Sequence, residues 1–239
     1  RFFNTSRRGA ELIKYASNAF LATKISFINE LANLSEKTGV DIKDISLGMG
    51  SDQRIGERFL RAGPAYGGSC FPKDTRALID TAKKFKIDLS IVSSVVTSNE
   101  KRKTLLTKRL EKILNNKLKN KVVTFLGVTF KPNTDDMREA SSIPMIEYLI
   151  KKNAKIRYYD PSGEKNEFRG LKYVKYCKTI SSACLKSDLI VLHTEWNDFR
   201  LLNFKKLVKK DTFKIFDMRN IYSPVKMKNQ KIDYFSIGR

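Results

Sequence analysis

The chain has 239 residues, of which 41% are hydrophobic and 30% are charged, as in an ordinary globular protein with one large core or two smaller ones. No stretch is long and apolar enough to span a bilayer, and the basic, polar start is not a signal peptide, so we expect no membrane partner. The three cysteines Cys70, Cys177 and Cys184 form no CxxC pair and leave one unpaired in any disulfide scheme. We therefore expect a reducing compartment, the cytoplasm.

The net charge of +22 raises the question of a nucleic-acid partner. Residues 1–120 hold 23 basic and 12 acidic side chains and residues 121–239 hold 24 and 13, so each half carries +11. A helix–turn–helix pattern at 35–48 has no Arg, Asn or Gln in its second helix to read bases. We predict a solvated basic surface that attracts anionic substrates, and no nucleic-acid partner.

Residues 8–38 predict a long amphipathic helix, because apolar side chains repeat there with a helical period. Gly39 is its expected stop. Three shorter elements are expected to follow before residue 120: a helix from Asp41 to Leu47 that ends in the Gly48-Met49-Gly50 turn, and helices over about 72–85 and 90–118.

The pattern changes at Asn120 to short apolar runs separated by helical segments. We expect strands at 122–128, 155–159, 189–192 and 213–216, with helices at 142–152 and about 198–209. This alternation is typical of a parallel sheet with crossover helices. The predicted fold is α/β: an all-helical domain over 1–118, then a Rossmann-like, doubly wound domain over 119–239 that lacks a GxGxxG fingerprint.

Residues 66–74, Tyr-Gly-Gly-Ser-Cys-Phe-Pro-Lys-Asp, carry the strongest functional signal. Two glycines permit a sharp turn or a close approach to a ligand, and Cys70 stands at a predicted helix start. Helix-terminal N–H groups and Lys73 would favour the nucleophilic thiolate of Cys70, while Asp74 could hold a water. A buried cysteine beside a glycine turn is the alternative, and the whole constellation favours a reactive thiol.

Lys14 and Asn18 are four residues apart and therefore share a helix face, from which they could stabilise an oxyanion formed on attack by Cys70. A solvent-facing pair is the alternative. His193 is the single histidine, which excludes histidine-rich metal sites and excludes a Cys–His couple unless it faces Cys70. We predict a structural histidine, no bound metal, and electrostatic activation of the thiol.

Lys131 and Arg138 flank the polar loop 132–136 after a predicted strand. Open α/β sheets bind ligands at the carboxyl ends of their strands, so this basic pair could bind a phosphate. A solvated loop explains the same residues nearly as well.

These segments together resemble the family of nucleotide-sugar dehydrogenases that oxidise a sugar C6 alcohol to a carboxylate, the UDP-glucose/GDP-mannose dehydrogenases. The resemblance covers almost the whole chain, and Phe71 is similar to the UDP-glucose branch, whereas GDP-mannose relatives more often have an aliphatic residue there. The matching segments are 11–18, 24–30, 67–74, 127–131 and 138–139.

The resemblance implies a four-electron oxidation of UDP-glucose to UDP-glucuronate with two NAD in turn. Cys70 matches the nucleophile that forms a thiohemiacetal and then a thioester. Lys14 and Asn18 match the residues that stabilise the oxyanions, Lys14 also contacting the substrate, and Asp74 matches the residue that helps to position the hydrolytic water.

The resemblance also implies the binding residues and a homodimer. Lys131 matches a UDP-sugar ligand, Lys73 and Arg138 match positions that reach NAD, and Arg54 resembles an arginine offered to the partner's substrate. The loop that wraps the substrate is matched by Phe59, Leu60, Arg61, Ala62, Gly63 and Gly67.

Three departures from the family pattern affect these expectations. The family begins with an NAD-binding Rossmann domain, whereas this sequence starts just before the central helix, so we expect a shortened enzyme or the product of a broken gene, inactive alone. Ala65 stands where glycine is common, which predicts a strained backbone, and Ser141 stands where proline often opens a helix. Two alternatives stay open: a dehydrogenase of GDP-mannose or a UDP-N-acetylhexosamine, and a non-catalytic UDP-sugar-binding dimerisation module.

Overall fold

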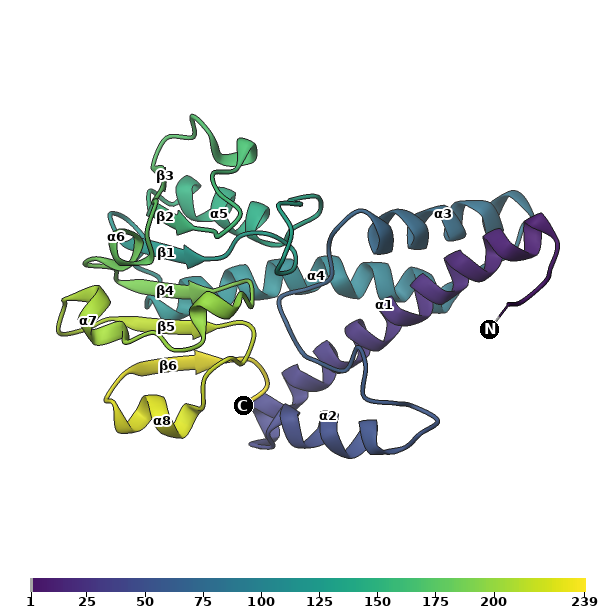
Figure 1. Cartoon of the computed structure of the whole chain (residues 1–239), viewed down its shortest axis with the longest axis horizontal. Coiled ribbons are helices and arrows are strands. Elements are labelled where there is room, and N and C mark those ends of the chain that lie inside the picture. The colour runs from purple at the N-terminus through teal and green to yellow at the C-terminus, as the bar shows by residue number, and fades with distance from the viewer. Residues whose placement is uncertain (1) are drawn as a thin grey trace.

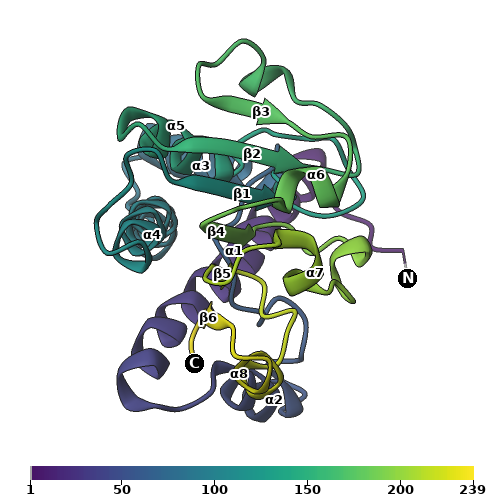
Figure 2. The same ribbon diagram turned by 90° about the vertical axis from the view of Figure 1, so that its left-hand side faces the viewer.

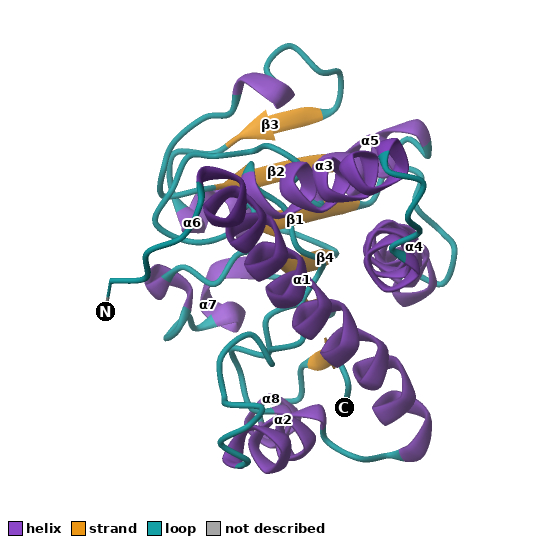
Figure 3. Cartoon of the chain, turned by 90° about the vertical axis from the view of Figure 1, so that its right-hand side faces the viewer, coloured by secondary structure: helices purple, strands orange, loops and turns teal. Residues whose placement is uncertain are grey.

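The computed structural model describes residues 2–239, and its first half is helical (Figure 1). Ser6 caps the first helix by accepting the Gly9 N–H at 3.1 Å, and Gly39, with φ of 74°, ends that helix in the left-handed conformation. Figure 3 shows this helix running the length of the helical half. The helices are α1 (Arg7–Thr38), α2 (Ile42–Ser51), α3 (Cys70–Lys84) and α4 (Ser90–Ile113).

Two of the predicted helix ends are wrong. Helix α2 does not stop at the Gly48-Met49-Gly50 turn but continues to Ser51, since neither Gly48 nor Gly50 adopts positive φ. Helix α4 ends at Ile113 instead of Leu118, since Asn115 and Asn116 adopt positive φ and break the helix.

The second half contains one six-stranded parallel sheet with the order β3-β2-β1-β4-β5-β6, seen in Figure 2. The order reverses between β1 and β4, which is the point where doubly wound folds bind ligands at the carboxyl ends of the strands. The predicted α/β fold class is confirmed. The strands are β1 (Val122–Leu126), β2 (Lys155–Tyr159), β3 (Val174–Tyr176), β4 (Leu189–Leu192), β5 (Lys214–Asp217) and β6 (Asp233–Ser236).

Helices cover both faces of the sheet: α4 and α5 pack on one face, and α6, α7 and α8 pack on the other (Figure 2). Four elements were not predicted from the sequence, because they are three to six residues long and too short for a clear period: β3, β6, α6 and α8. The predicted helix at 198–209 is two separate pieces. The further helices are α5 (Ser142–Lys151), α6 (Ile180–Cys184), α7 (Phe204–Val208) and α8 (Pro224–Asn229), with 3-10 turns η1 (Asn166–Phe168) and η2 (Asn197–Phe199).

Helix α4 belongs to the core of both halves. Its fully buried Leu110 lies in the same apolar cluster as Ile28 of α1, Phe125 of β1 and Phe216 of β5. Arg109 adds a contact from the same helix, with its guanidinium 4.9 Å from the centre of the Phe216 ring. The helical half and the sheet therefore share one core.

The end of the chain also joins the two halves. The Ile42 N–H donates to the Gly238 carbonyl at 2.8 Å, beside the end of α1 (Figure 1). A Cβ at Gly238 would come within 2.6 Å of the Ile42 side chain, so glycine permits this close contact. No helix within residues 2–239 combines the length and the apolar character needed to cross a membrane.

Because the core is shared, Leu110→Ala should destabilise both halves at once, by about 2–5 kcal/mol. Urea unfolding can be followed by far-UV circular dichroism, which reports the helices, and by fluorescence of the single Trp196 in the second half. The unfolding midpoints from the two signals should fall together. Lys108→Ala, exposed on the same helix, is the control. A shift in the dichroism midpoint alone would contradict a shared core.

Candidate active site

Cys70 is the first residue of α3 and is exposed, whereas Cys177 and Cys184 are buried. Burial raises the pKa of Cys184 to about 12 and raises that of Cys177 as well, so both stay protonated at neutral pH. Pro72 lies in the first turn of α3, where its missing N–H has no partner to lose. The structure therefore leaves one accessible thiol, at a helix N-terminus.

Gly67 and Gly68, just before Cys70, pack directly against the second half of the chain. The Gly68 N–H donates to the Arg138 carbonyl at 2.7 Å. A Cβ at Gly67 would lie 2.6 Å from the Glu139 carbonyl oxygen, and one at Gly68 would lie 2.6 Å from the Phe130 ring. The glycines thus allow the 127–141 connection to approach the cysteine segment closely.

Asp74, one turn after Cys70, is fully buried and gathers the predicted polar residues around it. Its Oδ2 accepts a hydrogen bond from Asn18 Nδ2 at 2.6 Å and lies 3.2 Å from Lys14 Nζ. Lys73 Nζ lies 3.7 Å from Oδ1, which accepts no hydrogen bond within the described chain. The structure brings together Lys14, Asn18, Lys73 and Asp74 at the start of α3.

The charge balance of this cluster favours an ionised Asp74. Burial raises the pKa of Asp74, but the hydrogen bonds from Asn18 and Lys14 and the two positive charges outweigh it, so the pKa lies below its usual value. The same hydrogen bond to Asp74 raises the pKa of Lys14, whose side chain is 58% exposed. A buried carboxylate therefore holds two cations near the thiol.

His193 is structural, as the sequence analysis predicted. Its ring is fully buried, with Nε2 2.9 Å from the Ser141 hydroxyl and Nδ1 3.1 Å from that of Thr194. Burial lowers its pKa to about 3, so the ring is neutral at physiological pH. Both nitrogens are occupied away from Cys70, and Ser141, where the family pattern has proline, provides one of the partners.

A cavity of about 500 Å³ lies between the helical half and the sheet, next to the cysteine segment. It contains most of the predicted substrate loop: Phe59, Arg61, Gly63 and Gly67 line it. Leu60 points into the core instead, and Ala62 does not line the cavity but packs against that core. Lys131 and Arg219 line it from the sheet side, so both halves of the chain build this cavity.

The cavity is strongly basic, since Arg58, Arg61, Lys131 and Arg219 line it and Glu57 is the one carboxylate among its lining residues. Such a surface attracts a diphosphate. Arg219 was missed from the sequence because it follows the short strand β5 without a recognisable motif. Its Nε donates to the His193 carbonyl at 2.8 Å and Nη2 to the Phe130 carbonyl at 3.0 Å, so its head group is held in place.

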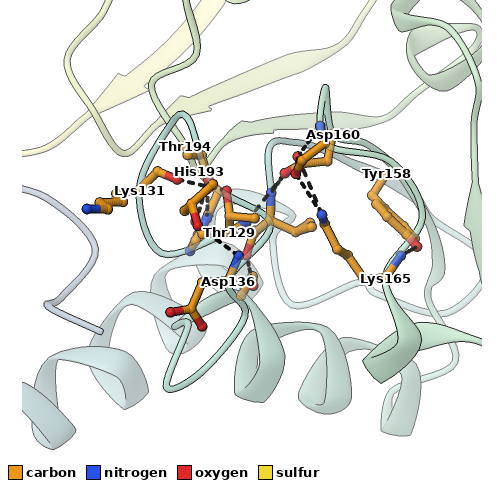
Figure 4. A network of polar contacts seen from close by, with 12 residues as sticks. Thr129, Lys131, Asp136, Tyr158, Asp160, Lys165, His193 and Thr194 are labelled. Atoms are coloured by element: carbon orange, nitrogen blue, oxygen red, sulfur yellow. Dashed lines mark hydrogen bonds and ion pairs between the residues drawn. The ribbon is translucent and has the colours of Figure 1, made fainter. Parts of the chain in front are cut away.

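Lys131 lies on a turn held rigid by a buried polar network (Figure 4). Asp160, after β2, accepts the Val128 N–H at 2.8 Å, and Thr194, after β4, donates to the Thr129 carbonyl at 2.6 Å. Figure 4 shows the Lys131 side chain pointing away from this network. The carboxyl ends of β1, β2 and β4 thus fix the turn and leave the Lys131 ammonium available to a ligand.

A second cavity, of about 640 Å³, is lined by neighbouring residues of the same segment, among them Gly68, Ser69 and Pro72. Lys73 and Arg138 also line it, and both side chains are 68% exposed. Arg76, Asp80 and Glu139 line it as well, so this open cavity carries three cations and two carboxylates and could accept a phosphate group. Of the two neighbours of Cys70 in the sequence, Ser69 lines this second cavity and Phe71 lines the first.

Arg54 lies apart from both cavities. Its side chain is 89% exposed and pairs with Asp52, Nη2 to Oδ2 at 2.6 Å. Within a single chain the structure does not bring it to the candidate site.

We expect Asp74→Asn to lower the melting temperature at pH 7 by about 2–4 °C, because it removes the attraction to Lys14 and Lys73. Since the pKa of Asp74 is lowered by folding, its stabilisation is present above the unfolded pKa of about 3.9 and is lost as the pH falls through the lower folded value. The difference in melting temperature between parent and variant should therefore begin to narrow below about pH 5 and should narrow further as the pH falls below about 3.9.

Thermal melts across this pH range check the prediction, with Asp80→Asn, exposed on the same helix, as the control. A gap that stays constant down to pH 3 would contradict the ionic role of Asp74.

Comparison with known proteins matches both halves of the chain to one family. Residues 8–101 match the central domain of the UDP-glucose/GDP-mannose dehydrogenase family, and residues 124–224 match its UDP binding domain. The UDP-glucose 6-dehydrogenase of Rhizobium meliloti (strain 1021) is 42% identical over 98% of this chain and 54% of its own length. The chain spans about half the length of the curated relatives it matches.

Solved structures agree with the sequence relatives. A UDP-glucose dehydrogenase from the hyperthermophilic archaeon Pyrobaculum islandicum has a TM-score of 0.84 and 32% identity, over 97% of this chain and 51% of that one. An NDP-N-acetyl-D-galactosaminuronic acid dehydrogenase from Methanosarcina mazei Go1 has a TM-score of 0.86 and 25% identity, over 98% and 51%. The resemblance predicted from the sequence is confirmed: the chain belongs to the UDP-glucose/GDP-mannose dehydrogenase family.

Proposed function

We propose that this chain provides the nucleophile and the substrate site of an NAD-dependent oxidation of UDP-glucose to UDP-glucuronate. The observation that carries the proposal is the position of Cys70, an exposed thiol at a helix start beside a basic cavity built by both halves. The relatives named UDP-glucose 6-dehydrogenase support the choice of substrate. Division of the chain into a dimerisation domain (1–118) and a UDP-binding domain (119–239) is part of this proposal.

The cavity next to Cys70 would bind the nucleotide sugar. Lys131 and Arg219 carry positive charge on fixed backbone near the strand ends, which supports a role in binding the diphosphate. Gly63 and Gly67 line the opposite wall of this cavity, so backbone atoms of the helical half would lie next to the bound sugar. With the diphosphate held there, the sugar C6 would extend toward the start of α3.

Cys70 would react with the C6 aldehyde. Its thiolate adds to the carbonyl carbon, and the resulting oxyanion would be stabilised by Lys14 and Asn18, both of which already converge on Asp74. After oxidation to a thioester, a water adds to the same carbon, the carbon–sulfur bond breaks, and the thiol is released with the acid. The unpartnered Oδ1 of Asp74 supports a role in holding that water.

Lys73 and Arg138, which line the second cavity, would hold NAD, and NAD would supply the acceptor for the hydrides that leave C6. Both cations are exposed, but Arg138 is paired with Asp136, Nη2 to Oδ2 at 2.9 Å, so a bound diphosphate would compete with that ion pair. The protein's contribution on this side is to orient α3 so that Cys70 lies between the two cavities.

Another substrate within the family is the second candidate. The Methanosarcina relative, which acts on an N-acetylated nucleotide sugar by its name, superimposes as well as the UDP-glucose enzyme does. The higher identity of the curated UDP-glucose 6-dehydrogenases favours UDP-glucose.

A homodimer in a reducing compartment completes the proposal. Apolar side chains remain exposed on α1 and α4, which supports a helical interface between two copies. Arg54, exposed and remote from the site of its own chain, would reach the site of the partner. The three unpaired cysteines are consistent with the cytoplasm. The exposed residues are Leu12, Ile13, Phe20, Phe27, Leu34, Ile91 and Leu105.

Iodoacetamide should alkylate Cys70 before Cys177 and Cys184, and UDP-glucose should slow that reaction by covering the thiol. Arg219→Gln should raise the UDP-glucose concentration needed for half-protection by roughly tenfold or more, the effect of losing a charged hydrogen bond. Peptide mass spectrometry measures the three rates. Arg200→Gln, at an exposed arginine of the same half, should protect like the parent. Absence of protection in the parent would overturn the proposed substrate site.

The chemical roles can be tested in a fusion with the part of the Rhizobium relative that this chain does not cover. There, Cys70→Ala should abolish UDP-glucuronate formation, and Lys14→Ala should lower kcat by roughly 10²–10³-fold, as for loss of one oxyanion donor. Lys37→Ala, exposed on the same helix, should leave kcat unchanged. Near-normal acid formation by Cys70→Ala would rule out the covalent route.

A further inference from the structure

The substrate loop 59–67 is held at two points by side chains from the helices behind it. At Gly63, the N–H donates to Asn29 Oδ1 at 2.9 Å, and the carbonyl accepts from Arg102 Nε at 2.6 Å. At Tyr66, the N–H donates to Asn99 Oδ1 at 2.9 Å, and the carbonyl accepts from Asn99 Nδ2 at 3.1 Å. Both backbone groups of both residues are therefore bonded to buried side chains instead of to water.

The backbone between these two points is strained. Ala65 has φ of 149°, a region that L-residues rarely adopt, and the cost is about 1–3 kcal/mol. Such a conformation persists when its surroundings hold it, and Gly63 and Tyr66 are the fixed residues on either side. The strain expected from the sequence at Ala65 is therefore present, and hydrogen bonds flank it.

Arg102 is well buried, and its acceptors are all neutral oxygens. Besides Gly63, it donates to the Asn29 carbonyl at 2.9 Å and to Asn33 Oδ1 at 3.2 Å. Burial lowers its pKa to about 9, so it stays charged at neutral pH without a bonded carboxylate. Burying a charged group costs free energy, and the hydrogen bonds that offset this cost at Arg102 go to the loop and to α1.

We propose that Asn99 and Arg102, adjacent on one face of α4, are positioning residues that hold the 59–67 loop in its ligand-binding shape. This inference rests on the proposed function, in which the cavity lined by the loop binds the nucleotide sugar. Neither residue needs to touch the ligand for this role. They act by keeping the loop in the competent conformation, since apparent affinity falls in proportion to the competent fraction.

Calorimetric titration of the chain with UDP-glucose tests the proposal. Asn99→Ala should raise Kd about tenfold, as expected when the competent fraction falls to about one tenth. Arg102→Lys keeps the charge but lacks the planar set of N–H donors of a guanidinium, so it should also raise Kd. Lys101→Gln, the exposed neighbour, should bind like the parent. Parent-like affinity in both folded variants would overturn the proposal.

Amide exchange by NMR separates this role from a general loss of stability, and it needs no ligand. In Asn99→Ala the Tyr66 amide should exchange faster, whereas buried amides such as Leu110 should keep their protection. Equal loss of protection across the chain would contradict a positioning role. If the parent does not bind UDP-glucose, the proposed function fails, and the exchange data still decide whether Asn99 holds the loop.

Relief of the strain provides a further readout. In the Ala65→Gly background the loop can keep its conformation without steric cost, so Asn99→Ala should raise Kd by clearly less than in the parent. If Asn99→Ala raised Kd by the same factor in the parent and in the Ala65→Gly background, the hydrogen bonds would not act on the strained residue. That result would contradict the proposal.

Discussion

The hydrogen bond from the Gly68 N–H to the Arg138 carbonyl ties the cysteine segment to the sheet, and the site depends on that close approach. It is possible because Gly67 and Gly68 leave no side chain between the two backbones. As a result, Phe130 and Lys131 after β1 face Gly63 and Gly67 of the helical half across one cavity. A larger residue at either glycine would separate the walls of that cavity.

Around this junction no histidine of residues 2–239 is placed to act as a base for Cys70. His193 is neutral, buried and bonded on both nitrogens, so it cannot serve as a base for Cys70. The buried Asp74 instead holds Lys14 and Lys73 beside the start of α3. In the proposed reaction these cations would stabilise the negative charge that develops on the sugar oxygen.

The sequence was sufficient for the fold class and for most of the site, for identifiable reasons. The long periodic segment 8–38 gave a correct helix, and the apolar run at 122–128 gave a strand, which ends earlier than predicted, at Leu126. The motif around Cys70 identified the nucleophile candidate. Short elements such as β3 and α8 were missed because three to six residues do not establish a period. Leu60, inferred by resemblance as a substrate residue, is a core residue on the loop.

The residues that the sequence could not reveal act through tertiary contacts. Arg219 joins the cavity only because the sheet places the end of β5 beside the turn after β1. Asn99 and Arg102 read as ordinary polar residues of an amphipathic helix, and their contacts with Tyr66 and Gly63 bridge more than 30 positions in the chain. Long-range hydrogen bonds of this kind leave no periodic signal in the sequence.

The central claim is that both halves of the chain close over one nucleotide-sugar site that presents the sugar C6 to Cys70. A crystal structure of the chain with UDP-glucose tests this claim most directly. The account predicts the diphosphate against Lys131 and Arg219, with C6 in contact with the Cys70 sulfur. A diphosphate bound at Lys73 and Arg138, with C6 remote from Cys70, would contradict it.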